Sequence, residues 1–178
     1  RPFVAVFGEL ADPACGERVL TAVRAAALRA RLRRARIGLA GSRVGGMTHT
    51  APNEFMLKRS IGPRVVPLDL PLLLQRAEAV APEARQKLWT EVVGRAGDCR
   101  VPDSAGLDSM GVYFALREIV AEEGLDAVSV GCYPHLMGRV CLAASLLADA
   151  GVPMACEGDV NGAVGQLILQ LLTGQPTH

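Results

Sequence analysis

Short apolar runs alternate with longer amphipathic stretches along most of this chain. Four of these runs are rich in Val, Ile, Leu and Ala and end at a polar or glycine residue: 36–41, 65–69, 126–131 and 152–156. Such runs are typical of strands that are buried on both faces of a parallel sheet. A further apolar run at 3–7 predicts one more strand near the start of the chain.

The stretches between these runs carry apolar residues at helical spacing. They predict helices at 16–34, from about 50 to 61, and at 70–80, 82–93, 107–123, 138–150 and 160–172. Thr50 is the expected cap of the second helix, and Asp69 is a good cap for the third. Gly124 and Gly151 follow predicted helices, as glycines at helix C-termini commonly do.

Strands that alternate with helices, joined by crossovers of this length, predict right-handed βαβ units. The expected fold is therefore α/β, a doubly wound three-layer αβα parallel sheet of the Rossmann or flavodoxin-like kind. The loops that carry His49, Asp69, His135 and Glu157 then share one edge of the sheet. Open parallel sheets bind their ligands at that edge, so candidate chemistry is sought there.

Composition narrows the class of protein. Half of the residues are hydrophobic, 4% are aromatic, and the formal net charge is +1. A near-neutral chain creates no field that attracts nucleic acid or a membrane surface. There is no apolar run long enough for a membrane span, no signal-peptide pattern and no C-x-x-C pair among the five cysteines. We expect a reduced, cytoplasmic protein that binds neither nucleic acid nor membrane.

The strongest chemical signal is the junction between the last predicted strand and the last predicted helix. The apolar run at 152–156 stops at Glu157 and Asp159, and the helical pattern starts at once. Two carboxylates at the end of a parallel strand suit a hard divalent cation, because Mg²⁺ and Mn²⁺ prefer oxygen ligands. Asp159 is equally well placed to cap the helix by accepting backbone N–H bonds. The residues themselves leave both interpretations open.

A second candidate site follows the strand at 126–131. Tyr133 and His135 offer a phenol and an imidazole, which suit the binding of hydroxyl groups or the movement of protons. The alternative is a loop that Pro134 holds rigid, with Tyr133 packed against a neighbour. His49, after the glycine-rich loop of the strand at 36–41, either faces the same crevice or faces water. All three are candidate substrate-binding residues.

These motifs resemble the family that contains L-fucose isomerase and L-arabinose isomerase. The Ala-Cys-Glu-Gly-Asp segment at 155–159 is similar to the Ala-x-Glu-Gly-Asp of the arabinose branch. The acid pair, the Asn-Gly step and the helix that ends Leu-Thr-Gly are similar to the fucose branch. Residues 37–70 and 116–135 also resemble the middle domain of these enzymes, so the similarity covers about 36–175.

The resemblance implies a metal-dependent aldose–ketose isomerase that interconverts an aldose and a ketose through an ene-diol. Glu157 and Asp159 match the acids of the family motif, and so they are the expected catalytic and metal-binding residues. The implied cofactor is Mn²⁺ or another divalent cation, and the implied substrate is a small sugar. The alternatives are a sugar- or small-ligand-binding domain without chemistry and a purely structural oligomerisation domain.

The resemblance also implies a domain organisation. Residues 1–35 are expected to be the end of a preceding α/β domain with its connecting helix, and 36–178 the central sugar- and metal-binding domain. In this family the remaining ligands, a Glu and a His, come from a C-terminal domain that this chain lacks. We therefore expect the fragment alone to be inactive and the full-length protein to be a homo-oligomer.

Overall fold

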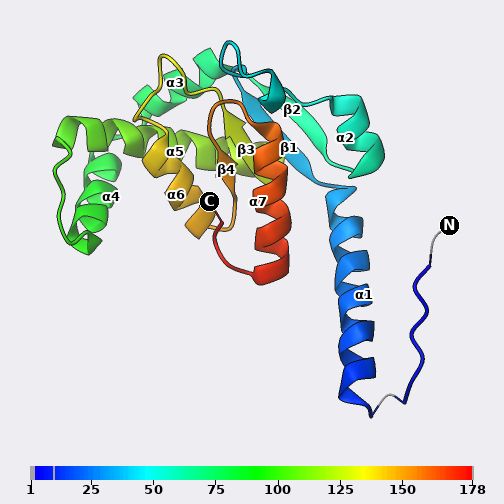
Figure 1. Cartoon of the computed structure of the whole chain (residues 1–178). Helices are drawn as coiled ribbons and strands as arrows, with labels where there is room; N and C mark the ends of the chain where they lie inside the picture. The colour runs from blue at the N-terminus through cyan, green and yellow to red at the C-terminus, as the bar shows by residue number, and fades with distance from the viewer. Residues whose placement is uncertain (1–2, 10, 178) are drawn as a thin grey trace.

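A computed structural model of the chain describes residues 3–9 and 11–177, in which four parallel strands form one sheet. The strands are β1 (Arg36–Ala40), β2 (Arg64–Leu68), β3 (Ala127–Val130) and β4 (Met154–Ala155), in the order β2-β1-β3-β4. In the register of the sheet, Gly38 lies between Val66 and Val128. Helices cover both faces, which confirms the predicted three-layer α/β fold (Figure 1).

The helices fall close to their predicted positions. They are α1 (Pro13–Leu32), the short 3-10 helix η1 (Thr48–Thr50), α2 (Glu54–Ser60), α3 (Leu70–Ala79), α4 (Pro82–Arg95), α5 (Asp103–Glu123), α6 (Cys141–Asp149) and α7 (Val160–Thr173). Asn53, rather than the predicted Thr50, caps α2, because its side chain accepts the Met56 N–H. None of the described helices combines the length and apolarity needed to span a bilayer.

Two apolar cores lie on opposite faces of the sheet. One joins the sheet to α3, α5 and α6, and fully buried Leu73, Leu116 and Leu147 contribute to it. The other joins the sheet to α7, α2 and the C-terminal end of α1, through residues that include Leu32, Leu57 and Leu167. The strands therefore have apolar side chains on both faces, as the unbroken apolar runs predict.

Helix α4 lies outside the three layers and packs against α5 (Figure 1). Its anchor is Trp89, which is buried while most of the helix faces water. The Trp89 indole Nε1 donates a hydrogen bond of 2.7 Å to the Asp103 carboxylate at the start of α5. Gly106 leaves room for the ring, because a Cβ atom at that position would overlap the indole.

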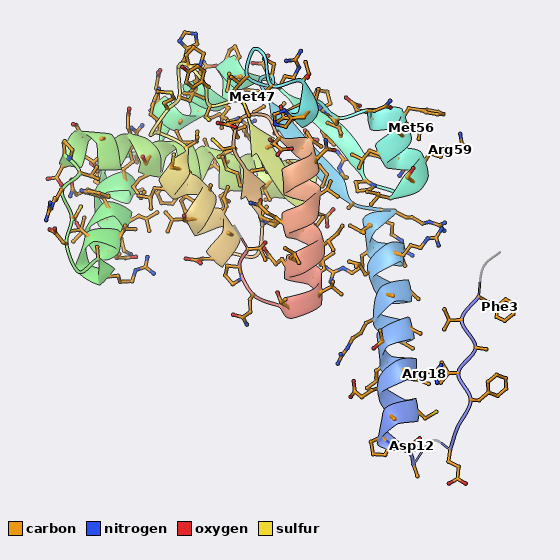
Figure 2. The ribbon with its side chains drawn as sticks, in the orientation of Figure 1. Phe3, Asp12, Arg18, Met47, Met56 and Arg59 are labelled. Carbon is orange, nitrogen blue, oxygen red and sulfur yellow. The ribbon has the colours of Figure 1, made fainter. Side chains whose placement is uncertain are left out.

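The strand predicted at 3–7 does not form. These residues have no regular secondary structure, and Phe3 and Phe7 are each 86% exposed. A strand requires a neighbour to pair with, and none of the four strands lies beside this segment. The segment instead runs alongside α1, where the Arg18 guanidinium donates a 3.5 Å hydrogen bond to the Ala5 carbonyl (Figure 2).

Both edges of the sheet are short or interrupted. The predicted strand at 152–156 is reduced to two residues, because the backbone turns away at Glu157, where φ is 62°. At its N-terminal end, the pairing with β3 begins at the Pro153 carbonyl, which accepts the Val128 N–H. At the opposite edge, β2 contains Pro67, which has no N–H to donate.

Candidate functional site

The strand order creates a crevice between the carboxyl ends of β1 and β3. The chain passes from β1 to β2 on one side and reaches β3 on the other, so the loops after β1 and β3 diverge. Doubly wound sheets bind ligands at such a switch point. A cavity of about 450 Å³ opens there. It is lined by Gly41, Ser42, Leu70, Pro71, Leu74, Gly131, Tyr133, Pro134, His135 and Leu136.

The loop after β3 brings two predicted residues to this cavity. Tyr133 is 53% exposed and His135 is also exposed, and both line the cavity wall. Tyr133 therefore lies at the cavity wall and not in a buried core, a position compatible with both interpretations of this loop. The hydroxyl and the imidazole are available to a polar ligand at the crevice, while their contact with a sugar stays a prediction.

His49 lies on the same side of the sheet but does not line the cavity. It is exposed within η1, and its backbone carbonyl accepts a 3.5 Å hydrogen bond from the Asn161 side chain at the start of α7. The histidine thus faces solvent, as one of the two interpretations proposed. Asp69 serves as the N-cap of α3, because its carboxylate accepts the Leu72 N–H at 2.9 Å.

Asp159 caps α7, and this interpretation of the acid pair is confirmed. Its Oδ1 accepts the Gly162 N–H at 2.8 Å. A carboxylate at the first turn also complements the positive end of the helix dipole. One carboxylate oxygen is therefore engaged in the fold, and any role of Asp159 as a metal ligand stays a prediction.

Glu157 holds an unusual backbone conformation. Its φ of 62° lies in the left-handed region, and Glu157 is the one non-glycine residue with positive φ among those the structure describes. Such a conformation costs an L-residue about 1–2 kcal/mol, and strained residues concentrate at functional sites. The Glu157 side chain is half-buried at the carboxyl end of β4, so its carboxylate is accessible from the edge of the sheet.

We expect Glu157→Gly to be more stable than Glu157→Ala by about 1 kcal/mol, because glycine adopts positive φ without the steric cost that alanine retains. Urea unfolding of the two variants measures the difference. The same pair at exposed Glu118, inside α5, is the control, and there alanine is expected to be the more stable by a similar amount. Equal stabilities at position 157 would contradict a strained backbone.

The backbone of the loop after β1 is held between the loops that follow β3 and β4. A Cβ atom on Gly131 would overlap the Ser42 carbonyl oxygen and lie 2.9 Å from the Ser42 nitrogen. A Cβ atom on Gly158 would lie 2.8 Å from both the Ser42 carbonyl oxygen and the Arg43 nitrogen. The Gly158 N–H also donates to the Val130 carbonyl at 3.1 Å. Close packing thus fixes the three loops relative to one another.

Two cysteines meet at the ends of β3 and β4, which sequence analysis did not predict. The Cys132 and Cys156 thiols are hydrogen-bonded to each other. Cys132 and the nearby Cys141 also disfavour a negative charge on the Cys156 sulfur. Burial, followed by this hydrogen bond, raises the pKa of the Cys156 thiol to about 12. Only the parallel pairing of β3 with β4 brings the two positions together, so spacing along the chain gave no signal.

Cys156 and Cys99 are both exposed, but we expect Cys156 to react with iodoacetamide more slowly at pH 8, because the reactive thiolate is scarce when the pKa is raised. Raising the pH towards 11 should accelerate the Cys156 reaction. Mass spectrometry of tryptic peptides measures both rates. Cys132→Ala removes the hydrogen bond and should speed the modification of Cys156, whereas comparable rates at the two cysteines in the unmodified protein would contradict the prediction.

Among residues 3–9 and 11–177, the side chains at the predicted metal site do not form a complete set of ligands. Within the described residues there is no group of three or more His, Cys, Asp or Glu side chains that could hold a metal ion. The donors at the edge of the sheet are Glu157 and Asp159, and Asp159 is already committed to the helix cap. The residues present therefore do not by themselves fit a bound divalent cation.

A larger cavity lies elsewhere among the described residues. It measures about 980 Å³ and lies along α4 and the end of α3, lined by residues that include Glu78, Arg85 and Leu107. Arg85 is engaged there in the turn between the helices, where it donates hydrogen bonds to the Ala77, Glu78 and Val80 carbonyls. None of the predicted site residues lines this cavity, so we assign the site to the crevice.

Comparison with known proteins points to sugar isomerases. No protein-family model matches the chain. The chain is 27% identical over 182 residues to proteins named sulfoquinovose isomerase from Priestia megaterium (strain ATCC 12872 / QMB1551) and Priestia aryabhattai, with 97% of this chain and 40% of each relative aligned. A sulfoquinovose isomerase from Alkalicoccus urumqiensis is 27% identical over 177 residues, with the same shares aligned.

These relatives refine the resemblance stated above. They support similarity to sugar isomerases in general and not to L-fucose isomerase in particular. The chain spans about 40% of the length of the curated relatives that it matches.

Proposed function

We propose that this chain is the α/β sugar-binding part of an aldose–ketose isomerase. The observation that carries the proposal is the similarity to sulfoquinovose isomerases along 97% of the chain. The crevice supports it, because Tyr133 and His135 offer polar groups at its wall. Glu157 does not line this cavity, but its loop is joined to the end of β3 by the hydrogen bond from the Gly158 N–H to the Val130 carbonyl. The proposed substrate class is sulfoquinovose or a similar hexose, taken from the printed name of the relatives.

In this proposal the residues of the chain bind the sugar and move a proton. Isomerisation of an aldose removes the proton from C2 and returns one to C1, by way of an ene-diol. Glu157 is the carboxylate that we assign to this transfer, since its strained backbone holds it at the end of β4. Tyr133 and His135 are assigned to hydrogen bonds with sugar hydroxyls.

We further propose a divalent cation, such as Mn²⁺, in the full-length protein. Glu157 and Asp159 would supply carboxylate oxygens, and further ligands would have to come from polypeptide outside the described residues. Such an ion supplies stabilisation of a developing oxyanion. We also propose that residues 1–35 are the end of a preceding α/β domain with its connecting helix, because most of the residues at 3–7 and most of α1 are exposed.

The test uses the full-length protein. Mn²⁺ binding is measured by calorimetry, and conversion of sulfoquinovose and of neutral aldoses to ketoses is measured by NMR. Glu157→Gln should abolish conversion. Asp159→Asn keeps an N-cap and should weaken Mn²⁺ binding while leaving the fold intact. An active Glu157→Gln variant would remove that residue from the mechanism, and an inactive wild-type protein with every aldose would refute the isomerase.

A second function is sugar binding without chemistry, for which Tyr133 and His135 at the cavity wall offer the polar groups. It predicts that Glu157→Gln leaves the affinity for the sugar unchanged and that the wild-type protein never converts it. Calorimetry with the sugar, run beside the NMR assay, separates the two functions.

A further inference from the structure

The cations at the carboxyl edge of the sheet are few. The loops that follow the four strands contain two arginines, Arg43 and Arg139, and no lysine. The Arg139 guanidinium forms an ion pair of 3.1 Å with Asp108 on α5. Arg43 is exposed and belongs to none of the ion pairs among the described residues. Its guanidinium donates a 3.3 Å hydrogen bond to the adjacent Val44 carbonyl.

The backbone of Arg43 is held by its neighbours, although its side chain forms no ion pair with the described residues. Its nitrogen packs against Gly158, which follows Glu157 directly, and the preceding Ser42 packs against Gly131. Arg43 does not itself line the cavity, but it follows Ser42, which does, and its main chain approaches the loop of the candidate carboxylate at Gly158. The other end of its loop is tied to α7 by the hydrogen bond from Asn161 to His49 (the loop is marked by Met47 in Figure 2).

The carboxylates at the carboxyl ends of the strands affect which ligands can bind there. Glu157 and Asp159 repel an anionic ligand, so a ligand with a negative substituent can bind here only if a cation compensates. Arginine is suited to this role, because its planar guanidinium binds sulfonate or phosphate oxygens through two parallel hydrogen bonds. Two further arginines, Arg31 and Arg34, lie at the opposite end of the strands, where they line a cavity with Asp126. A sugar held there would be a strand length away from Glu157.

We propose that Arg43 is a specificity-determining residue that binds an anionic substituent of the sugar, a sulfonate or a phosphate distant from the reacting carbons. The inference rests on the proposed function, and it names the residue that would distinguish anionic from neutral sugars at the same crevice. Arg43 does not touch the reacting atoms, and its contribution is to affinity and orientation.

The experiment compares sugars of different charge in the full-length protein. Sulfoquinovose, glucose 6-phosphate and glucose are the probes, and the variants are Arg43→Gln, Arg43→Lys and the control Arg59→Gln on exposed α2 (Figure 2). Loss of one charged hydrogen-bonding group is expected to lower kcat/KM for the anionic sugar by about 10- to 100-fold, mainly through KM. Arg43→Lys should recover part of the loss, while glucose and the control variant show no change. The anion preferred by the wild-type protein distinguishes sulfonate from phosphate.

Calorimetric binding separates this inference from the proposed function. If no sugar is converted but sulfoquinovose or glucose 6-phosphate binds in an Arg43-dependent way, the isomerase is refuted and the anion site stands. If the protein is active and Arg43→Gln affects charged and neutral sugars equally, or affects neither, the inference is overturned. Absence of any anionic sugar binding by the wild-type protein also overturns it.

Discussion

Replacing Trp89 by alanine is expected to destabilise the protein by about 3–5 kcal/mol, the usual cost of removing a large buried aromatic side chain. The indole is the buried anchor of α4, and its Nε1 hydrogen bond to Asp103 is lost with it. Because α4 packs against α5 and little else, the change should release α4 while the sheet stays folded. Hydrogen exchange of residues 82–95 together with urea unfolding measures both effects.

Two further variants make this prediction specific. Lys87→Ala, at an exposed position on the same helix, should leave both stability and exchange unchanged. Asp103→Ala should cost only the hydrogen bond, about 1 kcal/mol, and keep α4 protected. If the amides of α4 exchange at the same rate in Trp89→Ala as in the unmodified protein, the helix has a second anchor.

Gly131→Ala should destabilise the protein by about 1–3 kcal/mol, because overpacking forces the surrounding backbone to move. The added methyl group meets the Ser42 main chain, which cannot rotate away as a side chain can. The loop after β1 is then expected to separate from the loop after β3. Sugar binding at the crevice should fall with stability, and urea unfolding and calorimetry measure the two changes.

Gly165→Ala is the matched control, since a Cβ atom there meets no neighbour within 4 Å. In the interior of α7 this change should stabilise the protein by up to about 1 kcal/mol. Unchanged stability of Gly131→Ala would mean that the contact between the loops is loose, and the argument for fixed loops at the crevice would fail.

The elements that the sequence predicted well are those whose signal is local. The runs around Ile37, Val65 and Val128 are apolar at consecutive positions because each strand is covered by helices on both faces. Asp69 and Asp159 act as caps as the pattern indicates, since a cap depends on residues within one turn. Alternation of these elements was enough to predict the sheet, and it is also the basis for seeking the candidate site at the carboxyl ends of the strands.

The features that the sequence did not predict all depend on tertiary contacts. The run at 3–7 has the composition of a buried strand, but pairing depends on a neighbour that a sequence pattern does not reveal. The hydrogen-bonded thiols of Cys132 and Cys156, and the close approach of Gly158 to Arg43, join residues far apart in the chain. The sequence therefore predicted the candidate site only as a set of loops. The close packing of these loops, and the absence of an ion pair at Arg43 among the described residues, are seen only in the structure.

The two edge strands, β2 and β4, also determine whether one molecule can add a strand to the sheet of another. An exposed strand edge can pair with another chain, and a long flat edge favours aggregation. Here one edge has only two residues in β4, and the other has Pro67, whose missing N–H interrupts any added ladder. The apolar residues at 3–7 of one molecule thus find no continuous edge on the sheet of another. The fold disfavours strand exchange between copies, and growth into fibrils by that route is blocked at both sides of the sheet.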